Sequence, residues 1–182
     1  MLTLFQRSTA FLLCFTLCHS LAFANSKNDT ALKKLLRDEA TEVKIKYNLA
    51  KTNPSFKEMR IRPLSFNGVV LLTGEVTNTK LKQQAARITR NTEGVRQVHN
   101  QLVIAGKASY LSRMSDNWLE MKVKAKIMME EDLANSDIEV ASHRGTTYLI
   151  GRVNRKQAKK AVDIANEVGG VQKIVQVFDY RR

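Results

Sequence analysis

The same stretch occurs twice in this chain: IRPLSFNGVVLLTGEV at residues 61–76 returns as IEVASHRGTTYLIGRV at residues 138–153. The two copies align without a gap at a spacing of 77 residues. Six aligned positions are identical, and they are Ile61/Ile138, Ser65/Ser142, Gly68/Gly145, Leu72/Leu149, Gly74/Gly151 and Val76/Val153. Self-similarity at a fixed period indicates a repeated structural unit. The chain is therefore predicted to contain one small domain twice.

Each copy of this stretch has the pattern of a β-hairpin. In the first copy, strands are predicted over 59–66 and 69–77, joined through Asn67-Gly68, a dipeptide that readily takes the positive φ angles of a tight turn. In the second copy, His143-Arg144-Gly145 has the same place. The repeated stretch thus predicts two hairpins with the same connection.

A helix is predicted on each side of each hairpin. Apolar residues at four-residue steps indicate helices over 38–51 and 116–129. Asn78 and Asn154 are suitable N-cap residues for the helices that follow the hairpins. Third strands are predicted over 95–104 and 171–178. The fold class is α+β, with each copy in the order αββαβ and two helices packed on a three-stranded mixed sheet.

The N-terminal residues have the pattern of a secretory signal peptide. Arg7 precedes an apolar run over 11–18, and Ala22-Phe23-Ala24 has the small-x-small pattern that a signal peptidase cuts. The run is shorter than the roughly 20 apolar residues of a transmembrane helix. Cleavage is predicted after Ala24. The predicted organisation is a signal peptide at 1–24, a lead-in at 25–35, a first domain at 36–104, a linker at 105–115 and a second domain at 116–180.

The charge and the cysteine content indicate what kind of partner and what kind of chemistry the exported chain can have. The chain has 30 Lys and Arg against 17 Asp and Glu, and only Arg7 of these lies in the predicted signal peptide. In an exported protein, such a surface attracts the polyanions of the envelope, including phospholipid headgroups, rather than nucleic acid. Cys14 and Cys18 both lie in the signal peptide, and each follows a leucine, where a lipoprotein signal needs a small residue. No disulfide or thiolate metal site is expected in the exported chain.

The repeat resembles the BON domain family. The resemblance rests on the glycine inside the second strand and on the Gly-Val element before the third strand, which here are Gly74 and Gly94 in the first copy and Gly151 and Gly170 in the second. A glycine within a strand costs stability unless a bulge or close packing requires it. Asn100 extends the match in the first copy, whereas the second copy has Gln176 there. The second half is most similar to outer-membrane lipoproteins with two BON domains. Those proteins have a lipobox, which this sequence lacks, and in this respect the chain is more similar to osmotically inducible periplasmic BON proteins.

The resemblance implies a non-enzymatic periplasmic protein that supports outer-membrane integrity. Such a protein either diffuses freely in the periplasm or is bound peripherally to the outer membrane. It also implies that the first helix of the second domain binds anionic phospholipid. No cofactor is implied.

A helical wheel of 116–129 tests this implication independently. Leu119, Val123 and Ile127 share one face, equivalent to the core stripe of the first copy. The candidate lipid-binding residues form a nearly opposite apolar stripe with lysines on its flanks, and they are Trp118, Met121, Lys122, Lys124, Ala125, Lys126, Met128 and Met129. Such a second face suits an interfacial helix. The alternative is that this stripe packs against the other domain, because the first copy has a weaker stripe of the same kind.

Catalytic and metal chemistry find little support in the sequence. His99 and His143 are far apart in the repeat register and are expected to be surface or sheet residues, and the acidic run 130–132 has no histidine partner. No catalytic residue and no metal ligand is predicted. An alternative function is a stress-related periplasmic chaperone or envelope assembly factor, whose partners would be outer-membrane proteins or their assembly machinery. A scaffold within an envelope complex is a third possibility.

Overall fold

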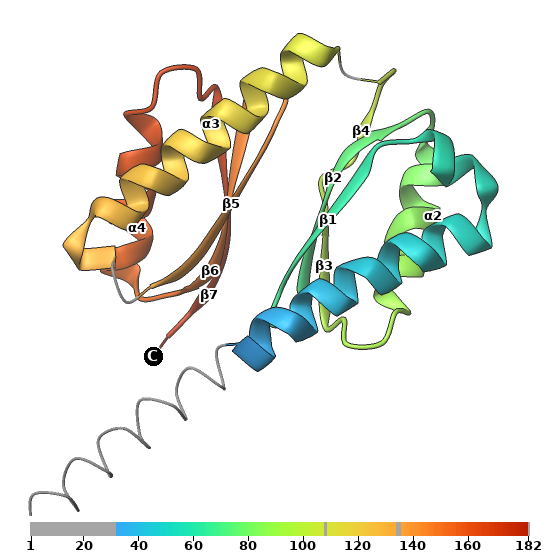
Figure 1. Cartoon of the computed structure of the whole chain (residues 1–182), viewed down its shortest axis with the longest axis horizontal. Coiled ribbons are helices and arrows are strands. Elements are labelled where there is room, and N and C mark those ends of the chain that lie inside the picture. Colours follow the sequence, from blue (N-terminus) through green and yellow to red (C-terminus); the bar gives the residue numbers. More distant parts are fainter. Residues whose placement is uncertain (1–31, 108, 134–135, 182) are drawn as a thin grey trace, which may run out of the picture. The chain divides into compact units, whose positions relative to one another are not determined.

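A computed structural model of the chain describes residues 32–107, 109–133 and 136–181 (Figure 1). The predicted signal peptide with its cleavage site, and the lead-in before residue 32, lie outside the described residues. The chain divides after Ala40 into two units, and the unit from Thr41 to Arg182 contains both sheets.

The first copy follows the predicted order. Its elements are a helix over 32–52, the 3-10 helix η1 (Pro54–Glu58), β1 (Ile61–Phe66), β2 (Val69–Val76), α2 (Thr79–Arg90), β3 (Gln97–Asn100) and β4 (Val103–Ile104). β2 lies in the centre, antiparallel to β1 and parallel to both β3 and β4. The sheet is therefore mixed, as predicted. The first helix extends into the predicted lead-in, and the single third strand predicted over 95–104 is interrupted.

The third strand is interrupted next to Asn100, whose side chain bonds both its own segment and α2. The Asn100 side chain accepts a hydrogen bond from the Leu102 backbone N–H (3.3 Å) and donates one to the Lys82 carbonyl in α2 (2.9 Å). Leu102 itself is fully buried in the core of the first copy. An asparagine that bonds its own backbone two residues on competes with the strand ladder. The strand continues at Val103, directly after the buried Leu102.

The second copy has the same order with an unbroken last strand. Its elements are α3 (Tyr110–Met129), the 3-10 helix η2 (Glu131–Leu133), β5 (Asp137–His143), β6 (Thr146–Val153), α4 (Arg155–Asn166) and β7 (Lys173–Tyr180). β6 is antiparallel to β5 and parallel to β7. α3 begins at Tyr110, so the predicted linker is shorter than expected. The Ser109 hydroxyl caps the helix by accepting the Ser112 N–H (3.1 Å), which lets the helix start before the predicted Asp116.

The hairpin connections are the tight turns that the sequence predicted. Both central residues of each turn have positive φ, 51° and 77° at Asn67 and Gly68 and 49° and 72° at Arg144 and Gly145. These are the angles of a type I′ turn. The strand glycine has a different reason, because a Cβ on Gly74 would lie 1.8 Å from the Arg60 carbonyl oxygen. In each copy, glycine is therefore required at two places. One is the hairpin turn, and the other is the strand position where two backbones lie close together.

Each copy builds a core between its two helices and one face of its sheet. In the first copy, Ile45 and Leu49 of the first helix pack with Val70 and Leu72 of β2. In the second copy, the corresponding core includes Val123 and Ile127 of α3 and Leu149 of β6, which are at most 5 % exposed. The predicted helical core stripes are confirmed in both copies.

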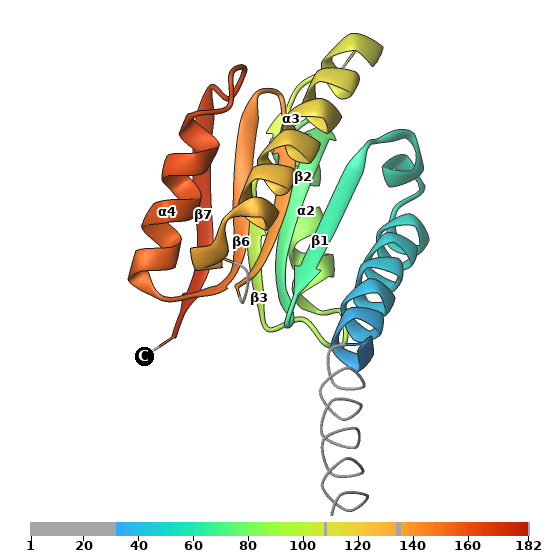
Figure 2. The same ribbon diagram turned by 60° about the vertical axis from the view of Figure 1, so that its left-hand side comes forward.

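The other face of each sheet packs against the sheet of the other copy. Successive strand residues point to opposite faces, so Leu71 turns away from its own core and joins Phe66 in a cluster with Tyr148, Ile150 and Val177 of the second copy. Figures 1 and 2 show the two sheets facing each other, with the helices on their outer sides. β2 and β6 are therefore buried on both faces, which explains their nearly continuous apolar sequences.

A buried polar cluster interrupts this apolar interface. Glu75 of β2 and His143 of β5 are 2 % and 3 % exposed, and His143 Nε2 lies 3.4 Å from Glu75 Oε1. Arg144 Nε also lies 3.4 Å from Glu75 Oε1, and its Nη2 donates to the Gly106 carbonyl (2.8 Å). Burial lowers the pKa of His143, and this outweighs the opposite effects of Glu75 and Asp116. His143 is therefore held in its neutral form near neutral pH.

Candidate membrane interface

The long helix α3 separates its apolar residues into a buried stripe and an exposed one. Leu119, Val123 and Ile127 point into the core of the second copy. Trp118 is 57 % exposed and Met129 is 84 % exposed. All eight candidate residues are exposed on α3, and they are Trp118, Met121, Lys122, Lys124, Ala125, Lys126, Met128 and Met129. The structure thus brings the predicted set together on one helix.

The alternative use of this stripe, as a contact with the other copy, is wrong. The copies meet through the inner faces of their sheets, in the cluster around Phe66, Tyr148 and Ile150. The apolar side chains of α3 opposite its core stripe stay exposed. A contiguous exposed apolar stripe on a folded domain indicates a surface for interaction.

The three lysines beside the stripe differ in their partners. Lys122 Nζ lies 4.9 Å from the centroid of the Trp118 ring, a cation–π arrangement that keeps a positive charge at the edge of the apolar surface. Lys124 pairs with Glu139 of β5 at 3.0 Å, and Lys126 pairs with Glu167 at 3.2 Å. Both of these pairs are solvent-exposed, and pairs of that kind contribute little, about 0–1 kcal/mol. The ammonium groups can therefore exchange their carboxylate partners for anionic headgroups at small cost.

One buried and one half-buried carboxylate hold α3 in place. Asp116 accepts the backbone N–H groups of Arg144 and Gly145 at the hairpin turn, at 2.9 and 3.0 Å. Glu120 accepts the Ser142 N–H at 3.2 Å and lies 3.5 Å from the Arg62 guanidinium of the first copy. These residues were not singled out by the sequence analysis. They set the rotation of α3, and hence the direction in which Trp118 faces.

The first turn and a half of α3 was predicted to be part of the linker, so its side chains were not among the candidate residues. Tyr110, Leu111 and Met114 are all more than half exposed, and Arg113 lies over the Tyr110 ring at 5.7 Å. The signal that could have found them is spacing, since Tyr110, Met114 and Trp118 follow one another at four-residue steps. The exposed apolar stripe therefore runs the whole length of the helix.

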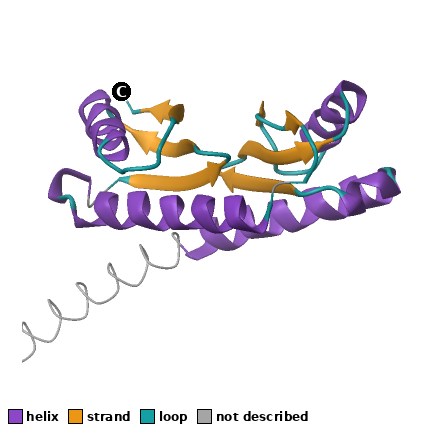
Figure 3. Ribbon diagram, turned by 90° about the horizontal axis from the view of Figure 1, so that it is seen from above, coloured by secondary structure: helices purple, strands orange, loops and turns teal. Residues whose placement is uncertain are grey.

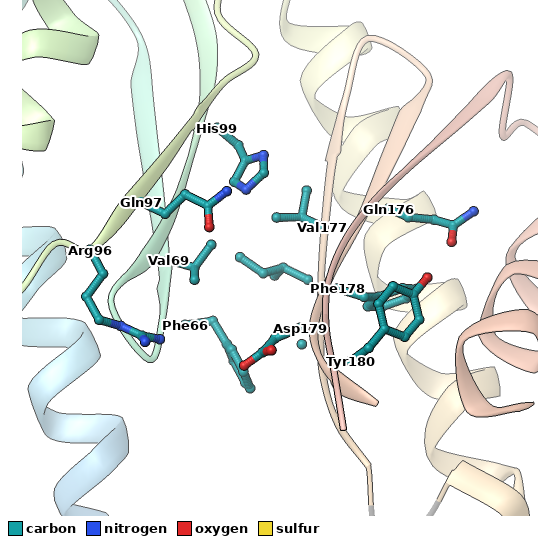
Figure 4. A pocket seen from close by; sticks show the side chains of 12 residues that line it. Phe66, Val69, Arg96, Gln97, His99, Gln176, Val177, Phe178, Asp179 and Tyr180 are labelled. Carbon is teal, nitrogen blue, oxygen red and sulfur yellow. The ribbon is translucent and has the colours of Figure 1, made fainter. Parts of the chain in front are cut away.

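A cavity of about 360 Å³ lies where the two sheets meet near the end of β7 (Figure 4). Gln97 and His99 of β3 line one side, and Val177 and Asp179 of β7 line the other. Burial lowers the pKa of His99, and Asp179 is paired with Arg152 at 3.0 Å. The lining therefore presents a neutral imidazole and a paired carboxylate, which do not form a nucleophile–base arrangement.

Acidic residues beyond α3 are paired with the neighbouring helix. Glu130 lies 3.2 Å from Lys160, and Asp132 lies 3.2 Å from Lys156, both in α4. Among the residues that the structure describes, no group of three or more His, Cys, Asp or Glu is placed to hold a metal ion. Within the same described ranges, none of the helices combines the length and the hydropathy needed to cross a bilayer.

The repeated αββαβ unit, its strand glycines and the helix-covered mixed sheets define a class of protein. A model of the BON domain matches this chain twice, at residues 37–106 and 115–182. The chain therefore belongs to the BON domain family and contains two BON domains.

Three relatives are similar over most of their length. The outer membrane lipoprotein DolP of Haemophilus influenzae is 36 % identical over 143 residues, which cover 79 % of this chain and 74 % of that protein. The 21 kDa hemolysin of Actinobacillus pleuropneumoniae is 29 % identical over the same shares of the two chains. The osmotically-inducible protein Y of Escherichia coli is 26 % identical over 83 % of this chain and 78 % of that protein.

Proposed function

We propose that this chain is a non-enzymatic protein of the bacterial periplasm that binds anionic phospholipid through α3 and supports the integrity of the outer membrane. The observation that carries the proposal is the exposed apolar stripe of α3 with lysines on both flanks. The relatives support an envelope location, since one of them is named an outer membrane lipoprotein. The formal net charge of +13 favours an anionic surface as the partner.

The chemistry of the stripe suits the boundary between headgroups and acyl chains. The Trp118 ring can be buried there while its N–H stays hydrated, and methionines such as Met121 and Met128 are flexible enough to fit between chains. Lys122 and Lys124 lie on opposite flanks, where their long stems can reach the headgroup phosphates. Shallow insertion of apolar side chains and attraction of lysines to phosphate then act together.

Co-sedimentation with lipid vesicles tests this proposal. We expect binding to vesicles that contain phosphatidylglycerol, little binding to phosphatidylcholine alone, and weaker binding as salt rises. Trp118→Ala should weaken binding by at least about tenfold, because burying a large apolar side chain contributes roughly 1.5–3 kcal/mol. Gln83→Ala is the control, since it truncates an exposed side chain of α2, away from the stripe, and leaves the net charge unchanged. Equal sedimentation with neutral and anionic vesicles would contradict the proposal.

A second candidate function is that of a stress-related chaperone or assembly factor for outer-membrane proteins. The observation that favours it is the number of exposed methionines on one helix, Met114, Met121, Met128 and Met129. Methionine surfaces adapt to varied apolar partners. This function predicts that stoichiometric amounts of the chain slow the aggregation of an unfolded outer-membrane protein. A lack of protection, together with vesicle binding, would select the lipid-binding function.

A further inference from the structure

The helix of the first copy also has an exposed apolar stripe opposite its core. Within the segment 41–52, Ile45 and Leu49 are buried, whereas Val43 and Tyr47 are 65 % and 62 % exposed. This segment lies in the same unit as α3. The structure offers no partner within the described residues that covers Val43 or Tyr47.

These exposed residues occupy the same positions in the repeat as the α3 stripe. At the spacing of 78 that aligns the two helices, Val43 corresponds to Met121 and Tyr47 to Ala125. The buried residues correspond as well, Ile45 to Val123 and Leu49 to Ile127. The two helices are therefore rotated in the same way against their sheets, because each fixes the same stripe in its core.

The first helix repeats the pairing of a cation with an exposed ring. Lys51 Nζ lies 5.7 Å from the centroid of the Tyr47 ring, as Lys122 lies over Trp118. Lys46 is also exposed on the flank of this stripe and corresponds to Lys124 of α3. Both helices therefore combine an exposed aromatic ring, a neighbouring apolar side chain and adjacent lysines. This combination is complementary to an anionic bilayer surface and poorly matched to a basic protein such as a second copy of this chain.

Segment 41–52 and α3 lie on the same side of the two facing sheets, whereas α2 and α4 lie toward the other side (Figure 3). The ion pair between Arg62 of β1 and Glu120 of α3 links the first sheet directly to the second long helix. The two stripes can therefore approach one surface without separating the copies.

We infer that segment 41–52 is a second membrane-contact element, so that the chain meets an anionic bilayer through Val43, Tyr47 and Lys51 as well as through α3. The inference rests on the proposed function and extends it from one helix to two. Two linked contacts bind more tightly than either alone, because the second contact forms within an already bound molecule.

Tryptophan emission tests each helix separately, because Trp118 is the only tryptophan in the chain. Trp118 should shift to shorter wavelength on vesicles of phosphatidylcholine with phosphatidylglycerol. A chain with Trp118→Phe and Tyr47→Trp should show the same kind of shift, because its tryptophan reports on the first helix. The matched control is Trp118→Phe with Gln83→Trp, which places the ring at an exposed position of α2 and should show no shift.

Binding of the same vesicles gives a second measurement. Val43→Ser with Tyr47→Ser should weaken binding by about tenfold, whereas Gln83→Ser should not, and circular dichroism should show that all variants fold. If Trp118 shifts but the tryptophan at position 47 behaves like that at position 83, the first helix does not touch the membrane and this inference is overturned. If no variant and not even the parent chain binds, the proposed function itself fails, and this inference fails with it.

Discussion

The two BON domains have the same order of elements but differ on the outer face of their first helix and along their last strand. The first helix has Ala40 and Val43 where α3 has Trp118 and Met121. Because Trp and Met bury more apolar area than Ala and Val, α3 provides the stronger interfacial surface. The core positions of the repeat keep apolar residues in both copies, whereas the positions opposite them differ in size and in aromatic content.

The inner faces of the two sheets differ in a complementary way. His143 stands where the first copy has Phe66, and Arg152 stands where it has Glu75. A symmetric interface would place two identical faces against each other. Here the acidic Glu75 of the first copy meets the neutral His143 and the cationic Arg144 of the second, so the counter-charge beside Glu75 comes from Arg144.

The largest expected effect is at the strand glycines, which the two copies share. A Cβ at Gly74, where φ is +122°, would lie 1.8 Å from the Arg60 carbonyl oxygen, and one at Gly151 would lie 2.0 Å from the Asp137 carbonyl oxygen. Gly74→Ala and Gly151→Ala should each lower the free energy of unfolding by at least about 3 kcal/mol, measured by urea denaturation. Gly169→Ala, where a Cβ meets no atom within 4 Å, is the control. A small loss at both strand glycines would show that the backbones can separate easily.

An intermediate effect is expected where the third strands differ. Asn100→Ala removes the bonds to the Leu102 N–H and the Lys82 carbonyl, and should cost about 1–2 kcal/mol. Gln176→Ala, at the corresponding exposed position of β7, should change stability by less than about 0.5 kcal/mol. Equal effects of the two substitutions, by the same denaturation measurement, would mean that Asn100 does not cause the break between β3 and β4.

The smallest effect is a dependence of stability on pH through His143. Its environment includes Glu75, Asp116, Arg144 and Arg60, and burial lowers its pKa below that of the unfolded chain. The unfolded state then binds more protons, so this contribution to stability is complete above the unfolded pKa of about 6.5 and decreases as pH falls below it. The loss amounts to about 1.4 kcal/mol for each pH unit by which the two pKa values differ.

His143→Phe isolates this contribution, because it introduces the residue that the first copy has at Phe66. In the variant, the stability should decline less between neutral and mildly acidic pH, because the contribution of His143 is absent. Thermal unfolding at several pH values in this range measures the decline. A decline that is unchanged in the variant would assign the pH dependence to other groups.

Local patterns were sufficient for most of the fold. The Asn67-Gly68 dipeptide predicted a tight turn with positive φ angles, and Asn154 predicted an N-cap, which accepts the Gln157 N–H at 2.8 Å. The core stripe of α3 followed from helical spacing alone. The start of α3 at Tyr110 did not follow from local patterns, because the serine and alanine residues near Gly106 are typical of a linker. The Ser109 cap becomes evident only in the structure. The break at Asn100 depended on a bond to α2, which is distant in sequence.

The sequence by itself determined the repeat, the αββαβ order and the two opposed apolar stripes of α3, because these depend on spacing and on residue type within a few turns of chain. Only the tertiary structure decided which surfaces meet. It placed Leu71 against Tyr148 and Ile150 between the sheets, and left Trp118 and Tyr47 exposed on the helices. The physical reason is that both faces of β2 and β6 are apolar, so the second sheet face is buried as well, whereas the lysines at the edges of the helix stripe favour contact with water.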